Sequence, residues 1–148
     1  MELSTSRTID APIDRVWALQ TDPEHWPDHL PNFSKVVRHA PAAPFGMGSS
    51  ADVTQPGLGT VTWTVDRYED APDRKTFSWT GTSRGTRFVG RHEVAERIAG
   101  RTELTLTIIA EGGVVAWMAP LMKGRLRKSL EAEMAAFERW ATAVATPR

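Results

Sequence analysis

The chain contains no cysteine, and this absence excludes several kinds of structure and chemistry. None of its 148 residues carries a thiol that could form a disulfide, act as a catalytic nucleophile or bind a metal ion. Excess charge is also missing, because Lys and Arg total 18 and so do Asp and Glu. A chain with zero net charge shows no electrostatic preference for nucleic acid. We therefore expect no nucleic-acid partner.

Targeting segments and long hydrophobic runs are missing as well. Residues 1–4 lack the basic-then-apolar pattern of a signal peptide. The apolar stretch 112–122 is too short to cross a bilayer. A chain without cysteine also suits a reducing compartment. Together these features predict a cytoplasmic protein with no integral membrane segment.

Motifs for cofactors, metals and covalent catalysis are absent too. The Gly-x-Gly and Gly-Gly pairs of the chain match neither the Walker loop nor the dinucleotide-binding pattern, and no Gly-x-Ser-x-Gly sequence occurs. His25 and His29 are four residues apart, but Pro27 lies between them and no third ligand follows from the spacing. We predict no metal site and no cofactor.

The last third of the chain predicts one long helix. After two glycines, roughly 30 residues as far as about position 143 carry no strand signal, enough for a helix of about 45 Å. Apolar residues recur along it at spacings of three and four, namely Met118, Met122, Leu126, Leu130, Met134, Phe137 and Ala141. The opposite face, which includes Glu133 and Glu138, is expected to be solvated. Pro120 is expected to bend the helix.

The rest of the chain predicts a sheet that this helix covers. Residues 3–10 have the pattern of a strand, and two short helices follow, one with Pro12 in its first turn and one capped by Asp22. Six further strands are expected at residues 33–39, 49–54, 60–68, 75–80, 87–97 and 101–110. Short turns between them favour antiparallel pairing. The predicted fold is a single α+β domain, residues 1–148, in which a curved antiparallel sheet of about seven strands wraps the long C-terminal helix.

This order of elements carries local motifs that resemble the START-like (helix-grip, SRPBCC) superfamily, most closely its polyketide cyclase/dehydrase-like branch. The matching pieces are residues 9–17 (IDAPIDRVW), 22–27 (DPEHWP), 31–33 (PNF), 46–48 (GMG) and 119–122 (APLM). The resemblance covers nearly the whole chain. It implies an apolar cavity between the sheet and the final helix, in a superfamily that includes lipid carriers, hormone receptors and aromatase/cyclases.

Strand alternation and the resemblance together indicate which side chains face such a cavity. Six tryptophans against one tyrosine provide flat apolar walls suited to a polycyclic, isoprenoid or lipid-like ligand. The expected ligand contacts are Trp17, Trp26, Trp63, Phe77, Trp79, Phe88, Leu106, Trp117, Met118 and Met122. Filling of an ordinary core explains the same residues. Binding of a small hydrophobic ligand is the first functional hypothesis.

Two polar residues share the inward registers and suggest an enzyme as the alternative. His92 is in register with Phe88 and Val94, where an imidazole can transfer a proton, or else be a core histidine satisfied by a neighbour. Arg67 is in register with Val65 and can orient an enolate oxygen, or else lie at the rim with its head in water. These residues are the catalytic candidates of a polyketide cyclase, aromatase or dehydratase.

A basic cluster on the final helix leaves a third hypothesis open. Lys123, Arg125, Arg127 and Lys128 are candidates to meet an acidic partner such as an acyl carrier protein, or anionic head groups. The simpler interpretation is a solvated face on which Arg127 pairs with Glu131. In the third hypothesis the cavity is vestigial and the apolar half of the helix binds another chain.

Overall fold

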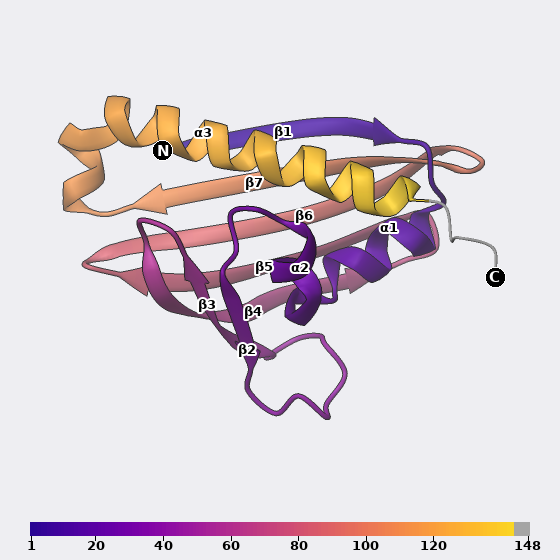
Figure 1. Ribbon diagram of the computed structural model, residues 1–148, viewed down its shortest axis with the longest axis horizontal. Helices are drawn as coiled ribbons and strands as arrows, with labels where there is room; N and C mark the ends of the chain where they lie inside the picture. Colours follow the sequence, from indigo (N-terminus) through magenta and orange to yellow (C-terminus); the bar gives the residue numbers. More distant parts are fainter. Residues whose placement is uncertain (144–148) are drawn as a thin grey trace.

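The described part of the chain folds into seven strands and three α-helices, seen in a computed structural model (Figure 1). The description covers residues 1–143. The side chains of residues 113, 114, 116 and 117 lie outside it, and the predicted ligand contact Trp117 is therefore among the undescribed side chains. The elements in order are β1 (Glu2–Ile9), α1 (Ile13–Gln20), the 3-10 helix η1 (Pro23–His25), α2 (Trp26–His29), β2 (Lys35–Arg38), β3 (Ser50–Gln55), β4 (Gly59–Asp70), β5 (Arg74–Ser83), β6 (Thr86–Ile98), β7 (Arg101–Glu111) and α3 (Gly113–Thr142).

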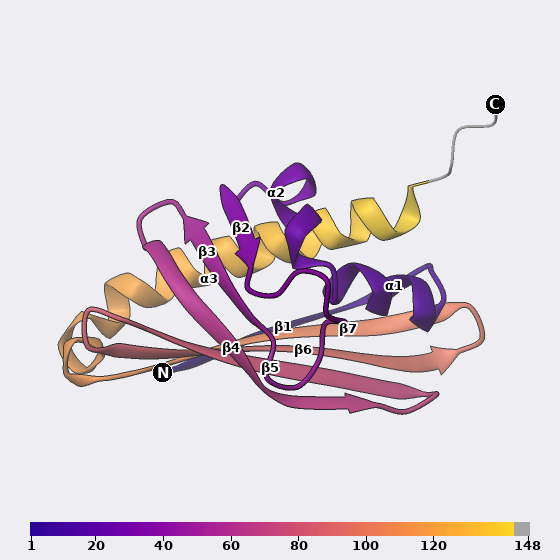
Figure 2. The same ribbon diagram turned by 90° about the horizontal axis from the view of Figure 1, so that it is seen from below.

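All seven strands belong to one antiparallel sheet in the order β1-β7-β6-β5-β4-β3-β2. The first strand closes against the last, with Leu3 opposite Ile108, while the other strands follow one another as hairpins. Figure 2 shows the helices on one side of the curved sheet, with α3 running along its length. This is the expected helix-grip arrangement, and the predicted α+β fold is confirmed.

Alternation of side chains explains why one face of the sheet is covered. In β4 the residues Val61, Trp63 and Val65 are buried, whereas the threonines between them are exposed. The same period of two recurs in β6 and β7. The apolar face therefore needs a cover, and α3 supplies it by packing mainly on β1 and β7.

The two helix starts differ in detail from their predicted form. Pro12 precedes α1 as its N-cap residue with extended backbone (ψ 154°) instead of occupying the first turn. Asp22 precedes η1, but its side chain makes no capping hydrogen bond. Its carboxylate contacts Nδ1 of His25 at 2.8 Å, because the ring lies within reach three residues further along the chain.

Candidate ligand-binding site

Three stacked rings form the centre of the space between the sheet and the helices. His92 and Phe77 are direct neighbours across β5 and β6, and their rings are parallel with centroids 4.5 Å apart. On its other side His92 stacks on Trp26 of α2 at 5.3 Å. Phe137 of α3 meets the edges of this stack. His92 is thus held in place by rings from the sheet and α2.

One ring nitrogen of His92 has its hydrogen-bond partner on α1. Its Nδ1 lies 2.8 Å from Oε1 of Gln20, a side chain that is itself fully buried. Because an amide oxygen only accepts, Nδ1 carries the proton in this arrangement. Burial lowers the pKa of His92 to about 3, so the ring is neutral at neutral pH. Gln20 was not among the predicted site residues, since a glutamine at a helix end carries no sequence signal of burial.

Helices α1 and α2 cover the part of the interior that contains the ring stack around His92. Trp26 donates its Nε1 hydrogen to the carbonyl of Leu19 at 3.0 Å, which fixes α2 on the end of α1. Trp17 packs on the edge of Phe77 at 6.0 Å, and Trp79 packs on Trp26 at 5.4 Å. These predicted ligand contacts are all buried by other side chains of the protein.

Small residues lie beside aromatic ones on the buried face of strands β3 to β7. Phe88 of β6 lies between Ala110 and Gly81 on the neighbouring strands, and Trp63 of β4 lies beside Ala51. A Cβ at Gly81 would come within 3.1 Å of the Trp63 ring, so the glycine gives the indole room. The result is a broad apolar surface in which Trp63 and Phe88 are the large side chains.

The apolar stripe of α3 is packed tightly at one end and loosely at the other. In the C-terminal half Leu130, Met134, Phe137 and Ala141 are buried. In the N-terminal half Met122 and Leu126 are only partly buried and pack against the core, and Met118 is 38% exposed. Met118 was predicted to lie on the inward stripe. Each step of four residues turns a helix by about 40°, so three such steps rotate it by about 120° away from Leu130.

A buried carboxyl group interrupts the same stripe. Glu133 was predicted to be solvated, yet it is 8% exposed and accepts a hydrogen bond from Nδ2 of Asn32 at 3.3 Å. The same Nδ2 donates to Oγ of Ser129 at 3.0 Å. Burial raises the pKa of Glu133 to about 7. The sequence did contain a signal for this burial that the prediction missed. Glu133 is three residues from Leu130 and four from Phe137, a spacing that puts it on the same face of the helix as these two buried residues.

Arg67 does not face the interior, and its predicted register was wrong. A β-bulge between Val65 and Arg67 shifts the pairing of β4 with β5. From this point Tyr68 takes the inward position, where it packs on Trp17 at 5.8 Å. Arg67 instead pairs with Glu69 at 3.0 Å on the exposed side. An inserted residue reverses the two faces of a strand, which alternation alone does not reveal.

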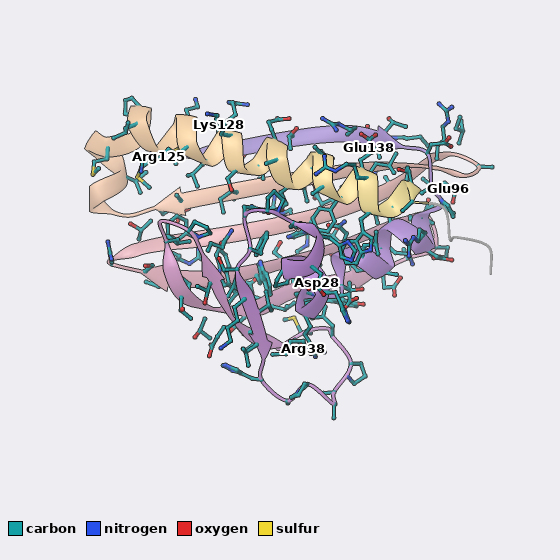
Figure 3. All side chains as sticks on the ribbon, viewed as in Figure 1. Asp28, Arg38, Glu96, Arg125, Lys128 and Glu138 are labelled. Carbon is teal, nitrogen blue, oxygen red and sulfur yellow. The ribbon has the colours of Figure 1, made fainter. Side chains whose placement is uncertain are left out.

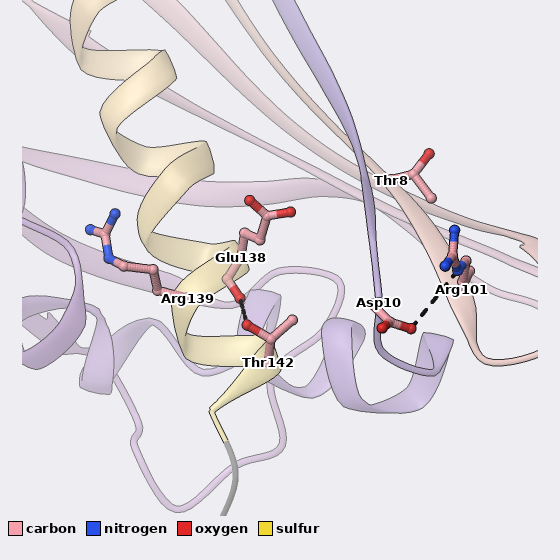
Figure 4. A pocket seen from close by; sticks show the side chains of 6 residues that line it. All are labelled: Thr8, Asp10, Arg101, Glu138, Arg139 and Thr142. Carbon is pink, nitrogen blue, oxygen red and sulfur yellow. Dashed lines mark hydrogen bonds and ion pairs between the residues drawn. The ribbon is translucent and has the colours of Figure 1, made fainter.

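Two surface depressions lie away from the predicted ligand contacts. One, of about 370 Å³, lies where β1, β7 and the end of α3 meet (Figure 4), lined by Thr8, Asp10, Arg101, Glu138, Arg139 and Thr142. Three of its four charged side chains are in ion pairs, Arg101 with Asp10 at 3.9 Å and Glu138 with Arg7 at 3.0 Å. The other, of about 90 Å³, lies between β5, β6 and β7.

Two further findings concern metals and membranes. Among the described residues, no three His, Asp or Glu side chains are grouped so that they could hold a metal ion. Within the same residues, no helix is long and apolar enough to span a bilayer.

Comparison with known proteins gives the fold and the family. The solved structures that match include a hypothetical protein from Helicobacter pylori (TM-score 0.85, 11% identity, 95% of this chain and 88% of that chain). They also include the Zhui aromatase/cyclase from Streptomyces sp. R1128 (TM-score 0.73, 20% identity, 95% and 93%). A third is a START superfamily protein from Mycobacterium smegmatis (TM-score 0.71, 15% identity, 95% and 96%). At these identities the likeness establishes the fold alone.

The family follows from the sequence model that matches the chain. No curated protein sequence matches significantly. The model described as "Polyketide cyclase / dehydrase and lipid transport" matches residues 1–141, which is nearly the whole chain. This protein therefore belongs to the polyketide cyclase/dehydrase and lipid transport family, within the START-like superfamily.

Proposed function

We propose that the protein binds a small hydrophobic ligand, lipid-like or polycyclic, between the sheet and the N-terminal half of α3. The family supports a role of this class, since its description covers both lipid transport and cyclases. The observation that carries the proposal is the uneven packing of α3. Its C-terminal half is sealed by protein side chains, whereas Met122 and Leu126 above the sheet remain partly exposed.

The side chains of the sheet and of α3 around the proposed site are apolar. Trp63 and Phe88 form the sheet surface, and their ring centroids are 6.4 Å apart. Ile108 of β7 is also only partly buried and packs against the core. An apolar guest that covers Met122, Leu126 and Ile108 removes their remaining surface from water, which favours binding by about 25 cal/mol per Å² buried. Of the predicted contacts, Met122 is the one we assign to the ligand, whereas Trp63 and Phe88 are 5% and 4% exposed and belong to the buried face of the sheet.

The residues favour binding over catalysis at this site. A histidine with a pKa of about 3 is a weak base and is not protonated at neutral pH, so it is poorly suited to proton transfer. Arg67 faces solvent on the other side of the sheet. We therefore assign His92 and Gln20 to the structural core. We propose no catalytic role for His92 or for Arg67.

A direct test is titration with the neutral fluorophore N-phenylnaphthylamine, which becomes bright in apolar surroundings. The wild-type protein should give saturable binding. Met122→Glu should weaken it at least about tenfold, because the ligand would have to desolvate a carboxylate. Leu121→Glu is the matched control, since Leu121 is the next residue, is equally apolar and is 62% exposed.

The control should bind within about twofold of wild type, since its charge stays in water. Equal loss in both variants, or no saturable binding by the wild-type protein, would refute the proposed site. Circular dichroism melting of both variants shows whether a loss of binding has its origin in unfolding.

A further inference from the structure

The outward face of the N-terminal half of α3 combines exposed apolar and basic side chains in one stripe. Met118, Leu121, Arg125 and Lys128 follow at spacings of three, four and three, which places them along one side of a helix. All four are exposed, Met118 by 38% and Leu121 by 62%. Figure 3 labels Arg125 and Lys128 on this half of the helix. We call these four residues the outer stripe.

Positive charge is concentrated around the outer stripe. Residues 112–130 contain Lys123, Arg125, Arg127 and Lys128 and no acidic residue, in a chain whose net charge is zero. None of the four makes an ion pair within the described residues, including the expected pair of Arg127 with Glu131. Their charges are therefore available to a partner.

The neighbouring turn extends the basic surface. Gly112, which precedes α3, lies so close to the carbonyl of Gly85 that an added Cβ would stand 2.6 Å from it. The start of α3 therefore packs on the turn between β5 and β6, at one end of the molecule (Figure 1). Arg84 in this turn is exposed as well.

From these features we propose that this end of the molecule docks on an anionic lipid surface, with α3 lying in the interface. Cations bind lipid phosphates, and each basic residue near an anionic bilayer adds to the attraction. The exposed Leu121 and Met118 favour a bilayer as the occupant, because cations beside apolar side chains are the pattern of a helix that lies in a lipid interface. Leu121, Arg125 and Lys128 are not among the residues assigned to the ligand, so docking and ligand binding can be tested with different variants.

Sedimentation with lipid vesicles tests this docking. The protein should bind vesicles of phosphatidylcholine mixed with phosphatidylserine and should not bind vesicles of phosphatidylcholine alone. Binding should weaken as salt is added, because the attraction is screened. The double variant Arg125→Glu and Lys128→Glu should bind the mixed vesicles at least about tenfold more weakly.

Two control variants separate docking through the outer stripe from a general effect of charge and from binding to an acidic protein. Lys35→Glu with Arg74→Glu makes the same change of charge at two exposed strand residues, and this variant should bind the mixed vesicles like wild type. Leu121→Ser should weaken binding about fivefold, because an inserted side chain is lost. Equal loss in both charge variants would overturn the proposal. Failure of the wild-type protein to bind the mixed vesicles would also overturn it. A third refuting result would be vesicle binding that Leu121→Ser leaves unchanged and that soluble polyglutamate abolishes, because this result is expected for an acidic protein partner.

Discussion

At the scale of single residues, burial moves the pKa values of His92 and Glu133 in opposite directions. The pKa of His92 falls from 6.5 to about 3, so between these values the unfolded chain binds more protons than the folded one. The free energy of unfolding then decreases as the pH falls below 6.5. The pKa of Glu133 rises from 4.5 to about 7, so between these values the folded chain binds more protons. Its contribution to the free energy of unfolding increases as the pH falls from 7 to 4.5.

The two residues should therefore offset each other between pH 4.5 and 6.5. Each slope is about 1.4 kcal/mol per pH unit at most. In His92→Phe only Glu133 of this pair still titrates, so the free energy of unfolding should rise as the pH is lowered through this window. In Glu133→Gln only His92 of the pair still titrates, and the free energy of unfolding should fall as the pH is lowered. Urea unfolding of both variants at several pH values measures the slopes, and parallel slopes would contradict the assignment.

Which residues titrate in the core was only partly predictable from the sequence. His92 was placed inward correctly because the alternation of β6 is regular. Its partner Gln20 comes from an element 72 positions away, and a pair so distant leaves no local pattern. Arg67 was misplaced because the bulge before it changes the register without changing the composition of the strand.

At the scale of elements, α3 has two halves with different packing. Its length and position follow from a local periodicity, and the observed bounds Gly113–Thr142 are close to the predicted ones. The difference between its halves depends on what lies opposite each half. The C-terminal half packs on α1, α2 and their aromatic rings, whereas the apolar side chains of the N-terminal half, Met122 and Leu126, are only partly buried. That contrast depends on the elements packed against each half, so the sequence of α3 alone does not predict it.

The two halves should respond differently to truncation. Phe137→Ala should lower the free energy of unfolding by about 3–5 kcal/mol, because a fully buried ring leaves a cavity. Met122→Ala should cost less than about 2 kcal/mol, because part of the side chain is already in contact with water. Urea unfolding of the two variants at neutral pH provides the comparison. Losses of similar size would mean that the N-terminal half of α3 is packed as tightly as the other, contrary to the basis of the proposed site.

At the scale of the whole molecule, the fold separates a closed end from an open one. The closed end holds α1, α2 and the ring stack around His92. The open end holds the start of α3, at the opposite end of that helix from α1 (Figures 1 and 2). The proposed lipid-docking surface is on the outside of the same open end. A hydrophobic ligand that resides in a bilayer would thus meet the protein next to its proposed binding site.

The central claim, that a hydrophobic ligand enters under the N-terminal half of α3, can be tested with the methionines of the protein. Met122 lies in the open half and Met134, which is fully buried, in the sealed half, with Met118 at the rim and Met1 and Met47 elsewhere. NMR spectra of protein labelled with ¹³C at the methionine methyl groups, recorded during titration with N-phenylnaphthylamine, report on each position separately. We expect the signal of Met122 to shift most and that of Met134 to stay nearly unchanged. Saturable binding that shifts Met134 or Met47 and leaves Met122 unaffected would contradict the claim.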